Sequence, residues 1–232
     1  MLTFDNLILR QGEFTLSASF QVPAHHVTAI IGPSGAGKST LLAAVAGFLR
    51  PASGALLWND VDITARSPSE RTVSVLFQDN NLFPHLTVSE NVGLALRSDL
   101  KLSHDQVKNV SRALVDVGLT EMELRKPSAL SGGQQSRAAL ARVLLANKDI
   151  LLLDEPFAAL GPGLKSEMLS LVKSKLSMPG KTVLMVTHDP QDAHAIADYV
   201  ILVAEGKAMA PIRTKTLFDN PPDTLKDYLG SA

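Results

Sequence analysis

Cysteine is absent from this sequence of 232 residues. Its absence excludes disulfide bonds and metal sites built from thiolates, and it fits a protein of a reducing cytosol. Charge of one sign is also not in excess, because 22 Lys and Arg residues face 23 Asp and Glu residues and leave a net charge of -1. Such a chain has no strong positive field to attract phosphate backbones. We therefore expect no nucleic-acid partner.

Long apolar runs are missing as well. Runs such as residues 27–31, 150–153 and 200–203 have the length of buried strands, whereas a membrane-spanning helix needs about 20 apolar residues. The first residues, MLTFDNLILRQGEF, carry acidic and polar side chains where an export signal needs an uninterrupted apolar stretch. We expect a chain that is not exported by that route and that needs another chain to span any membrane it serves.

Two strand patterns divide the sequence. Residues 14–22 alternate apolar and polar side chains with a period of two, which predicts a strand with one buried face in an antiparallel sheet. Other segments are continuously apolar, as strands covered on both faces are. These segments are residues 27–31, 73–77, 150–154, 182–187 and 199–203. They predict a central parallel sheet wrapped by helices.

A helical insert interrupts this pattern between residues 87 and 146. Thr87 with Glu90, and Ser103 with Gln106, have the spacing of capping boxes at helix starts. Apolar side chains then recur at helical spacing, at Val107, Val110, Leu114 and Val117. Near the end of the chain, residues 219–230 predict a short closing helix with Pro222 near its start. No repeat or linker indicates a second independent domain.

A glycine-rich motif follows the first continuously apolar segment. Residues 32–39, GPSGAGKS, match G-x-x-x-x-G-K-[ST] between an apolar strand and the helical run TLLAAVAGFL. In this motif, which we call the phosphate loop, backbone N–H groups and the helix start face phosphates, the lysine reaches the outer phosphates, and the hydroxyl binds Mg2+. A chance glycine-rich turn is the alternative. The predicted triphosphate site comprises Gly32, Pro33, Ser34, Gly35, Ala36, Gly37, Lys38, Ser39 and Thr40.

Two consecutive carboxylates end another apolar segment. Asp154 and Glu155 follow residues 150–153 and should lie at the carboxyl edge of the sheet, where α/β proteins bind ligands. There Asp154 would support Mg2+ and Glu155 would polarise the attacking water. A solvated acidic strand end is the alternative. Beside a phosphate loop, the pair predicts that the phosphate is hydrolysed as well as bound.

Three further motifs complete the pattern. They are LSGGQ at residues 130–134, Gln78 after one apolar segment and His188 after another; alone, each would pass for a structural feature. With the phosphate loop and the acid pair, in this order, they resemble the ATP-binding-cassette (ABC) ATPase family over essentially the whole chain. The resemblance implies an α/β P-loop NTPase with a RecA-like mixed or parallel sheet and an antiparallel β subdomain. It also implies one domain over residues 1–232, with the helical insert at about 85–146.

The resemblance further implies a head-to-tail homodimer in which each ATP lies between the phosphate loop of one chain and LSGGQ, the signature loop, of the other. The N–H groups of Ser131 and Gly133, at a helix start, suit that second anion contact. The implied signature contacts are Ser131, Gly132, Gly133 and Gln134. The implied Mg2+ ligands are Ser39, Gln78 and Asp154. The implied catalytic residues are Glu155, His188, Gln78 and Lys38, with His188 holding the γ-phosphate and positioning Glu155.

Two positions depart from the family pattern. Gly161 stands where the family usually has an aspartate that faces the dimer partner, so communication between the two ATP sites is expected to be weaker or to use backbone groups. In addition, residues 9–14 contain no tyrosine to stack on adenine. Arg10 or Phe14 would have to take its place, although Phe14 also fits the buried face of its strand. The preference for ATP over GTP is therefore left open.

The single cassette, the short insert and the neutral charge favour transport over the soluble tasks of this family, such as DNA repair and translation. A kinase or other phosphotransferase is a further alternative, but such an enzyme would have no use for LSGGQ. Residues 78–92 resemble the importer-type segment that receives a permease, with Leu82, Phe83 and Leu86 as apolar anchors or, alternatively, as packing within the insert. Residues 46–64, and residues 71–96 followed by 100–103, closely resemble the ATP-binding subunits of bacterial thiamine importers. Importers of iron(III), molybdate or polyamines share much of this pattern, and a soluble ABC ATPase without a permease is the remaining alternative.

The importer resemblance also implies partners and a location. We expect a homodimer of ATPase subunits bound to an integral membrane permease, which receives its substrate from a periplasmic solute-binding protein. The chain would then act as a peripheral protein on the cytoplasmic face of the bacterial inner membrane. Substrate choice would belong to the permease and the binding protein, so the thiamine assignment rests on resemblance alone.

Overall fold

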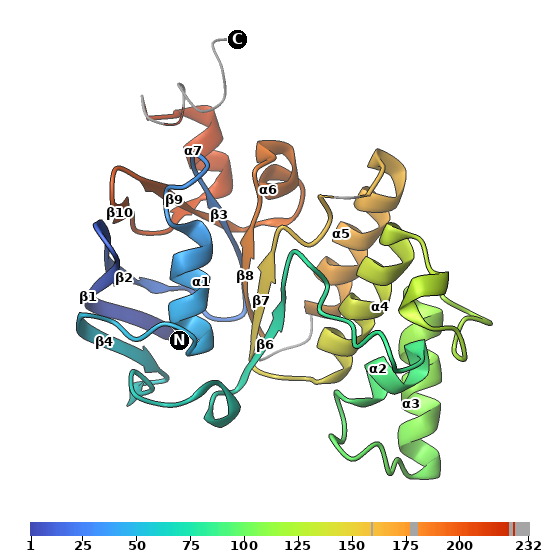
Figure 1. Ribbon diagram of the computed structural model, residues 1–232. Helices are drawn as coiled ribbons and strands as arrows, with labels where there is room; N and C mark the ends of the chain where they lie inside the picture. Colours follow the sequence, from blue (N-terminus) through green and yellow to red (C-terminus); the bar gives the residue numbers. More distant parts are fainter. Residues whose placement is uncertain (159, 177–180, 223–224, 226–232) are drawn as a thin grey trace. The chain divides into compact units, whose positions relative to one another are not determined.

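The computed structural model describes residues 1–158, 160–176, 181–222 and 225, without the side chains of 175 and 176. The chain forms two compact units (Figure 1). The first unit comprises residues 1–73, 149–154 and 176–232, and the second comprises 74–148 and 155–175. Among the described residues, no helix is both long and apolar enough to cross a membrane.

The first unit contains a mixed sheet with the strand order β5-β4-β1-β2-β10-β9-β3-β8-β7, and β11 pairs with β9. The strands at the start of the chain are β1 (Leu2–Gln11), β2 (Phe14–Val22), β3 (Val27–Ile31), β4 (Ser53–Trp58) and β5 (Val61–Asp62). The later strands are β7 (Ile150–Asp154), β8 (Thr182–Val186), β9 (Tyr199–Ala204), β10 (Lys207–Ala208) and β11 (Ile212–Arg213).

The antiparallel part of this sheet confirms the prediction for residues 14–22. Strand β2 pairs with β1, and β1 pairs with β4, both antiparallel. Leu16, Ala18 and Val22 are buried, while Phe14 and Phe20 at the same face are half-buried. The period of two therefore marks the buried face as expected, because successive side chains of a strand point to opposite faces.

The central strands β9, β3, β8 and β7 run parallel, as their continuous apolar character predicts. The register aligns Ile30 of β3 with Val186 of β8, and Val186 with Asp154 of β7. These residues stand at or next to the carboxyl ends of their strands. The loops that follow β3, β7 and β8 therefore leave the sheet at one edge, which is where parallel sheets bind ligands.

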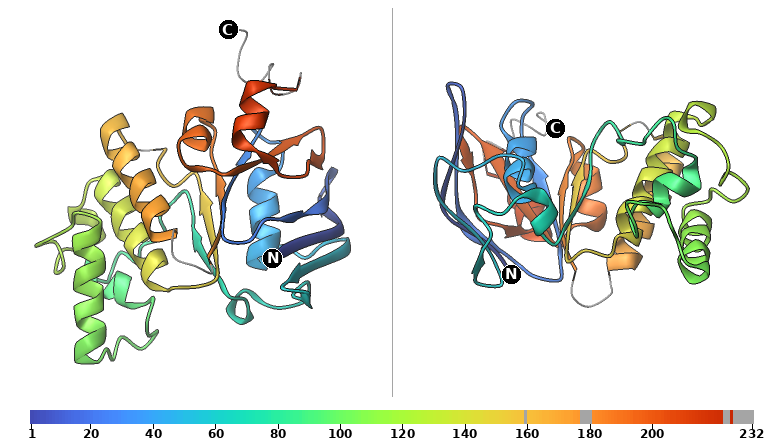
Figure 2. Two further views of the ribbon diagram at one scale, coloured as in Figure 1. Left: turned by 180° about the vertical axis from the view of Figure 1, so that it is seen from behind. Right: turned by 60° about the horizontal axis from the view of Figure 1, so that its bottom comes forward.

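Among the described residues, three α-helices belong to the first unit. Helix α1 (Lys38–Ala46) contacts β1, β7 and β8, and it begins at the phosphate loop as the sequence predicts (Figure 1). Helices α6 (Pro190–Ile196) and α7 (Thr214–Asp219) contact each other, α6 against β3 and α7 against β9; the view from behind shows them side by side (Figure 2). The predicted closing helix with Pro222 near its start falls mostly outside the described residues.

The second unit is helical. Strand β6 (Val73–Leu76) leads into it, and α2 (Val88–Gly93), α3 (His104–Asp116), α4 (Gly132–Leu145) and α5 (Pro162–Leu176) follow. Both predicted capping boxes are present at the starts of α2 and α3. The unit contains the expected insert at residues 85–146 and extends beyond it on both sides. The description of residues 1–232 as one domain stays a prediction.

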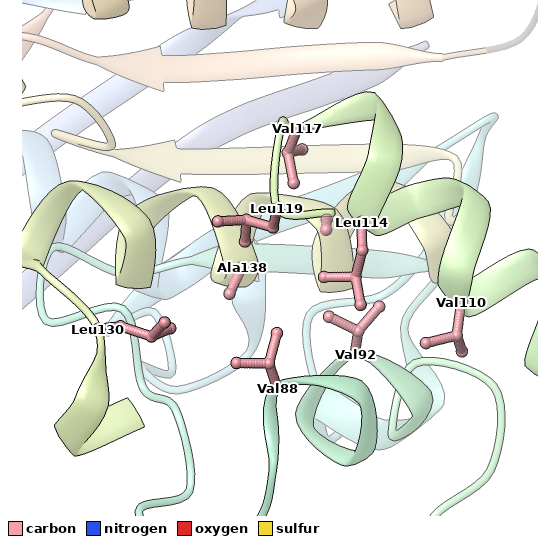
Figure 3. Close-up of a cluster of buried hydrophobic side chains, with 9 residues drawn as sticks. Val88, Val92, Val110, Leu114, Val117, Leu119, Leu130 and Ala138 are labelled. Atoms are coloured by element: carbon pink, nitrogen blue, oxygen red, sulfur yellow. The ribbon is translucent and has the colours of Figure 1, made fainter. Parts of the chain in front are cut away.

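Helices α2, α3 and α4 share a hydrophobic core (Figure 3). The predicted stripe of α3 contributes Val110 and Leu114, and Val117 joins them from the helix end. Val107 does not join this core, because 47% of its surface is exposed. The buried stripe of α3 is therefore shorter than the helical spacing of its apolar residues suggests. Val107 lies one turn from the helix start, where a side chain can still point past the neighbouring helices.

The carboxyl end of α1 is held by a buried arginine. Arg71 is 4% exposed, and its guanidinium donates to the carbonyl oxygens of Ala44 at 2.7 Å and Val45 at 2.8 Å. It also donates to the carbonyl oxygens of Thr64 and Arg66. Burial, with the nearby Arg66 charge as a lesser cause, lowers the pKa of Arg71. A positive charge among the last carbonyls of a helix satisfies groups that have no partner within the helix.

We expect Arg71→Gln to lower the free energy of unfolding by about 1–3 kcal/mol, the cost of leaving a buried carbonyl without a donor. This carbonyl is that of Val45, because the Ala44 carbonyl also accepts from the N–H of Gly47. Urea denaturation followed by circular dichroism measures the change. Arg66→Gln is the matched control, since the Arg66 side chain is exposed and only its backbone takes part. An equal loss in both variants would show that the carbonyl contacts of Arg71 do not stabilise α1.

Candidate nucleotide site

The phosphate loop depends on glycines at positions where a side chain would not fit. Gly32 has φ 147°, and a Cβ built on it would lie 2.0 Å from the carbonyl oxygen of Val203. Gly37, the N-cap of α1, has φ 103°, and its Cβ would lie 2.6 Å from Cζ of Phe14. Gly35 has φ 76° but open space around it. Residues 33–35 of the loop are exposed between β3 and α1, which suits close approach of a phosphate.

Lys38 folds back over this loop. Its Nζ donates to the carbonyl oxygen of Gly32 at 2.8 Å and to that of Pro33 at 2.9 Å, and only 8% of the residue is exposed. The ammonium group is thus held inside the loop, where a bound phosphate would compete with the two carbonyls for its protons. The role of Lys38 as the cation of the phosphate site stays a prediction, and this placement leaves its ammonium group available for it.

Ser39 and Asp154 meet at the start of α1 and the end of β7. The Ser39 hydroxyl donates to a carboxylate oxygen of Asp154 at 3.1 Å. Among the described residues, no group of three or more His, Asp or Glu side chains could hold a metal ion. A hydroxyl and a single carboxylate instead fit Mg2+ bound with few protein ligands, as it is when substrate phosphates and waters complete the shell.

The β1–β2 hairpin also reaches the phosphate loop. The Thr40 hydroxyl donates to Oε1 of Gln11 at 3.2 Å, and the edge of the half-buried Phe14 ring lies against Gly37. Arg10 on the same hairpin is exposed. Sequence reasoning missed Gln11, because 29 residues separate it from its partner and no local pattern announces the contact. The choice between Arg10 and Phe14 as a base-stacking residue stays a prediction.

His188 stands in the turn between β8 and α6. Thr187 fixes this turn, because its N–H donates to the carbonyl oxygen of Ile30 and its hydroxyl donates to Oδ2 of Asp192 at 2.9 Å. Asp189 caps α6 by accepting from the N–H of Gln191. His188 itself is exposed. The register of the strands brings this turn to the same sheet edge as the phosphate loop and Asp154.

The remaining predicted residues belong to the second unit. Glu155 directly follows Asp154 and has a left-handed backbone with φ 46°, a conformation that costs a non-glycine residue about 1–2 kcal/mol. Such strain is concentrated at functional positions. Gln78 is exposed two residues beyond the end of β6. The first unit thus assembles Lys38, Ser39, Asp154 and the His188 turn, while Glu155, Gln78 and the signature loop are carried by the second.

The signature loop caps helix α4 with its own side chains. Ser131 is the N-cap, its hydroxyl accepts from the N–H of Gln134, and Oε1 of Gln134 accepts from the N–H of Ser131 at 2.9 Å. The family resemblance implies that the N–H of Ser131 faces an anion. A phosphate binding there would have to displace the Gln134 side chain. The S-x-x-Q spacing could have revealed this capping box from the sequence alone.

Comparison with known proteins gives a consistent result. Residues 16–158 match the family model described as ABC transporter. The chain is 56% identical, over all of both chains, to the "Thiamine import ATP-binding protein ThiQ" of Ruegeria sp. (strain TM1040). It is 51% identical to the protein of that name from Escherichia coli (strain UTI89), over 82% of each chain.

Solved structures of similar fold are ATP-binding cassettes. The dimeric cassette MJ0796 bound to ADP and Pi has a TM-score of 0.81 at 29% identity, and the match covers 92% of this chain and 99% of that chain. A nucleotide-free cassette from an ABC transporter has a TM-score of 0.84 at 27% identity, over 100% and 99% of the two chains. These matches confirm the predicted fold, a P-loop NTPase cassette with a mixed sheet and helices.

We expect Gly32→Ala to damage the phosphate loop more than Gly35→Ala. A methyl group at position 32 meets the Val203 carbonyl, and such overpacking costs about 1–3 kcal/mol beyond backbone strain. At position 35 the methyl has room, so only the left-handed backbone is penalised, by about 1–2 kcal/mol. Urea unfolding compares the stabilities, and calorimetric titration with ATP compares the affinities. Equal losses in the two variants would contradict the close approach of Gly32 to Val203.

Proposed function

The chain belongs to the ABC transporter family, and we propose that it is the ATP-hydrolysing subunit of a bacterial thiamine importer. The ATPase activity is supported by the Ser39–Asp154 hydrogen bond at the start of α1, together with the ammonium group of Lys38 held inside the phosphate loop. Thiamine is supported by the name of full-length relatives that are 56% identical. Likeness of this extent covers the surfaces that meet partners as well as the nucleotide site.

Residues of the first unit would bind the nucleotide. The N–H groups of residues 32 and 34–40 would hold the β- and γ-phosphates, and Lys38 would leave the carbonyls of Gly32 and Pro33 to pair with the outer phosphates. Ser39 and Asp154 of this unit, with Gln78 of the second unit, would hold Mg2+, which when bound neutralises charge on the phosphates. His188, at the same sheet edge, would donate a hydrogen bond to the γ-phosphate.

Glu155 would act on the attacking water. Its carboxylate would accept a proton as the water oxygen bonds to the γ-phosphorus, and ADP would leave with the bridging oxygen. Gln78 would orient the same water through its side-chain amide. His188 would help to hold the Glu155 carboxylate in place. Because Glu155 and Gln78 belong to the second unit, hydrolysis would require the two units to adopt one particular arrangement around ATP.

The active form would be a homodimer. The likeness to the dimeric cassette MJ0796 bound to ADP and Pi supports this assembly. In such a dimer, residues 131–134 of one chain would contact the nucleotide held by the other. An integral membrane permease and, through it, a periplasmic solute-binding protein would be the further partners. The chain would then act at the cytoplasmic face of the inner membrane. Phe83, 47% exposed, is the candidate anchor for the permease, whereas Leu82 packs on the core of the second unit.

Disruption of the gene should abolish uptake of radiolabelled thiamine, and the wild-type chain should restore it. Glu155→Gln should fail to restore uptake at equal protein level, because the amide cannot accept the proton of water, while the purified variant should still bind ATP.

Uptake of iron(III), molybdate and polyamines in the same strains tests the other importers. Normal thiamine uptake in the disrupted strain would refute the thiamine assignment, and recovery of the chain only with ribosomes or DNA would refute transport.

Gly161→Asp should change cooperativity in ATP. A Cβ at position 161 meets nothing within 4 Å, so the aspartate would be tolerated and could accept hydrogen bonds across the proposed dimer interface. The Hill coefficient of ATP hydrolysis should rise, with the affinity for a single nucleotide changed by less than about twofold, since no ATP contact is altered. Gly163→Asp is the matched control, because its Cβ also meets nothing within 4 Å. An unchanged Hill coefficient in Gly161→Asp would refute the idea.

A further inference from the structure

We propose that Arg142 is a positioning residue for ATP hydrolysis, because it fastens the loop that carries Gln78 to the helix that begins at the signature loop. Its Nη1 donates to the carbonyl oxygen of Asn81 at 2.9 Å, and its Nη2 donates to that of Asn80 at 3.2 Å. Both contacts lie within the second unit. The inference rests on the proposed role of Gln78 at the Mg2+ and the water.

The loop after Gln78 is held in a conformation that its own backbone does not favour. Asn80 and Asn81 are consecutive left-handed residues, with φ 59° and 47°. Asparagine tolerates this conformation better than most residues, but two in succession still cost free energy. The N–H of Asn80 donates to the carbonyl oxygen of Phe77 at 3.0 Å, so the turn encloses Gln78. The carbonyls of Asn80 and Asn81 are the ones that Arg142 takes up.

Arg142 is suited to hold such a turn. It is half-buried in the last turn of α4, and burial lowers the pKa of its guanidinium, although an arginine remains protonated at neutral pH. A partly desolvated charge needs acceptors, so the contacts to the two carbonyls are favoured. The planar guanidinium presents its donors in a fixed fork, which fixes the direction of both carbonyls at once. A lysine could not reproduce this geometry.

The contact joins two elements that the proposed mechanism assigns to different nucleotides. Gln78 would act on the ATP of its own chain, while residues 131–134 would bind the ATP of the partner. Arg142 lies ten residues beyond Gly132 along α4, about 15 Å at the rise of an α-helix. A shift of α4 that follows from nucleotide at the signature loop is thereby transmitted to the turn around Gln78.

The chain offers a matched control on the same helix. Arg137 is also half-buried, and its Nη1 donates to the carbonyl oxygens of Val117 and Gly118, each at 3.0 Å. It therefore fastens α4 to the end of α3 with the same number of carbonyl contacts but does not contact the loop after Gln78. A purely structural role would predict the same consequences for Arg137→Gln as for Arg142→Gln.

The test measures ATP hydrolysis, binding of a fluorescent ATP analogue and Tm on the full chain. The wild type comes first, because absence of hydrolysis there would refute the proposed function rather than this inference. Arg142→Gln should lower kcat by about tenfold, the scale of one lost positioning contact, with nucleotide Kd within about twofold. Arg137→Gln should lower Tm by about as much as Arg142→Gln does. It should nevertheless keep kcat within about twofold, because no nucleotide-facing loop is released. Arg142→Lys should give an intermediate kcat.

A double-mutant cycle with Gln78→Ala identifies the route of the effect. If Arg142 acts through Gln78, the double variant should hydrolyse ATP no more slowly than Gln78→Ala alone. Additive losses would overturn the proposal, and so would a fall in kcat for Arg137→Gln equal to that for Arg142→Gln. If Arg142→Gln does not fold, Arg142→Lys takes its place in the cycle, and wild-type kcat in that variant would also overturn the proposal.

Discussion

The close approach of Gly32 to the carbonyl of Val203 is the constraint on which the nucleotide site depends. A Cβ at this position would lie 2.0 Å from the carbonyl oxygen, so only glycine lets the chain leave β3 and turn into the phosphate loop beside β9. The parallel register then places the ends of β7 and β8 at the same edge. The Ser39–Asp154 contact and the turn that holds His188 follow from that alignment. Arg71 completes the arrangement by satisfying the far end of α1.

Left-handed backbone occurs at several described positions, and some of these positions belong to segments assigned to hydrolysis. Glu155, Asn80 and Asn81 all have left-handed φ values, and each lies in or next to a segment assigned to hydrolysis. At Asn80 and Asn81 specific contacts offset the strain, since Arg142 donates hydrogen bonds to the carbonyls of both asparagines. Strain that is balanced by a few directed hydrogen bonds is released when those bonds change. An ATPase that changes conformation requires segments whose strain can be released in this way.

Sequence patterns predicted local features well and long-range contacts poorly. The alternation of residues 14–22, the capping boxes of α2 and α3 and the phosphate loop all depend on spacing within a few residues, so the sequence displays them directly. The sequence does not display the partners of Gln11, Arg71 and Arg142, because each of these contacts forms only after distant segments fold together. Val107 has helical spacing but is exposed, since periodicity places a residue on a face without saying how far the neighbouring helices extend.

The segment from Gln78 to Thr87 connects these observations to transport. Arg142 holds it near Gln78, and the buried side chain of Asn91 holds its other end by accepting from the N–H of Phe83 and donating to the carbonyls of Phe83, Leu86 and Thr87. The backbone of Phe83 is held in this way, yet the residue remains 47% exposed, with its ring edge-on to His85. A partner that pushes on Phe83 would therefore act on a short segment tied at both ends, with Gln78 just beyond one tie. Coupling of transport to hydrolysis then needs no long pathway through the core, because the proposed permease contact and the proposed water-orienting residue share one stretch of backbone.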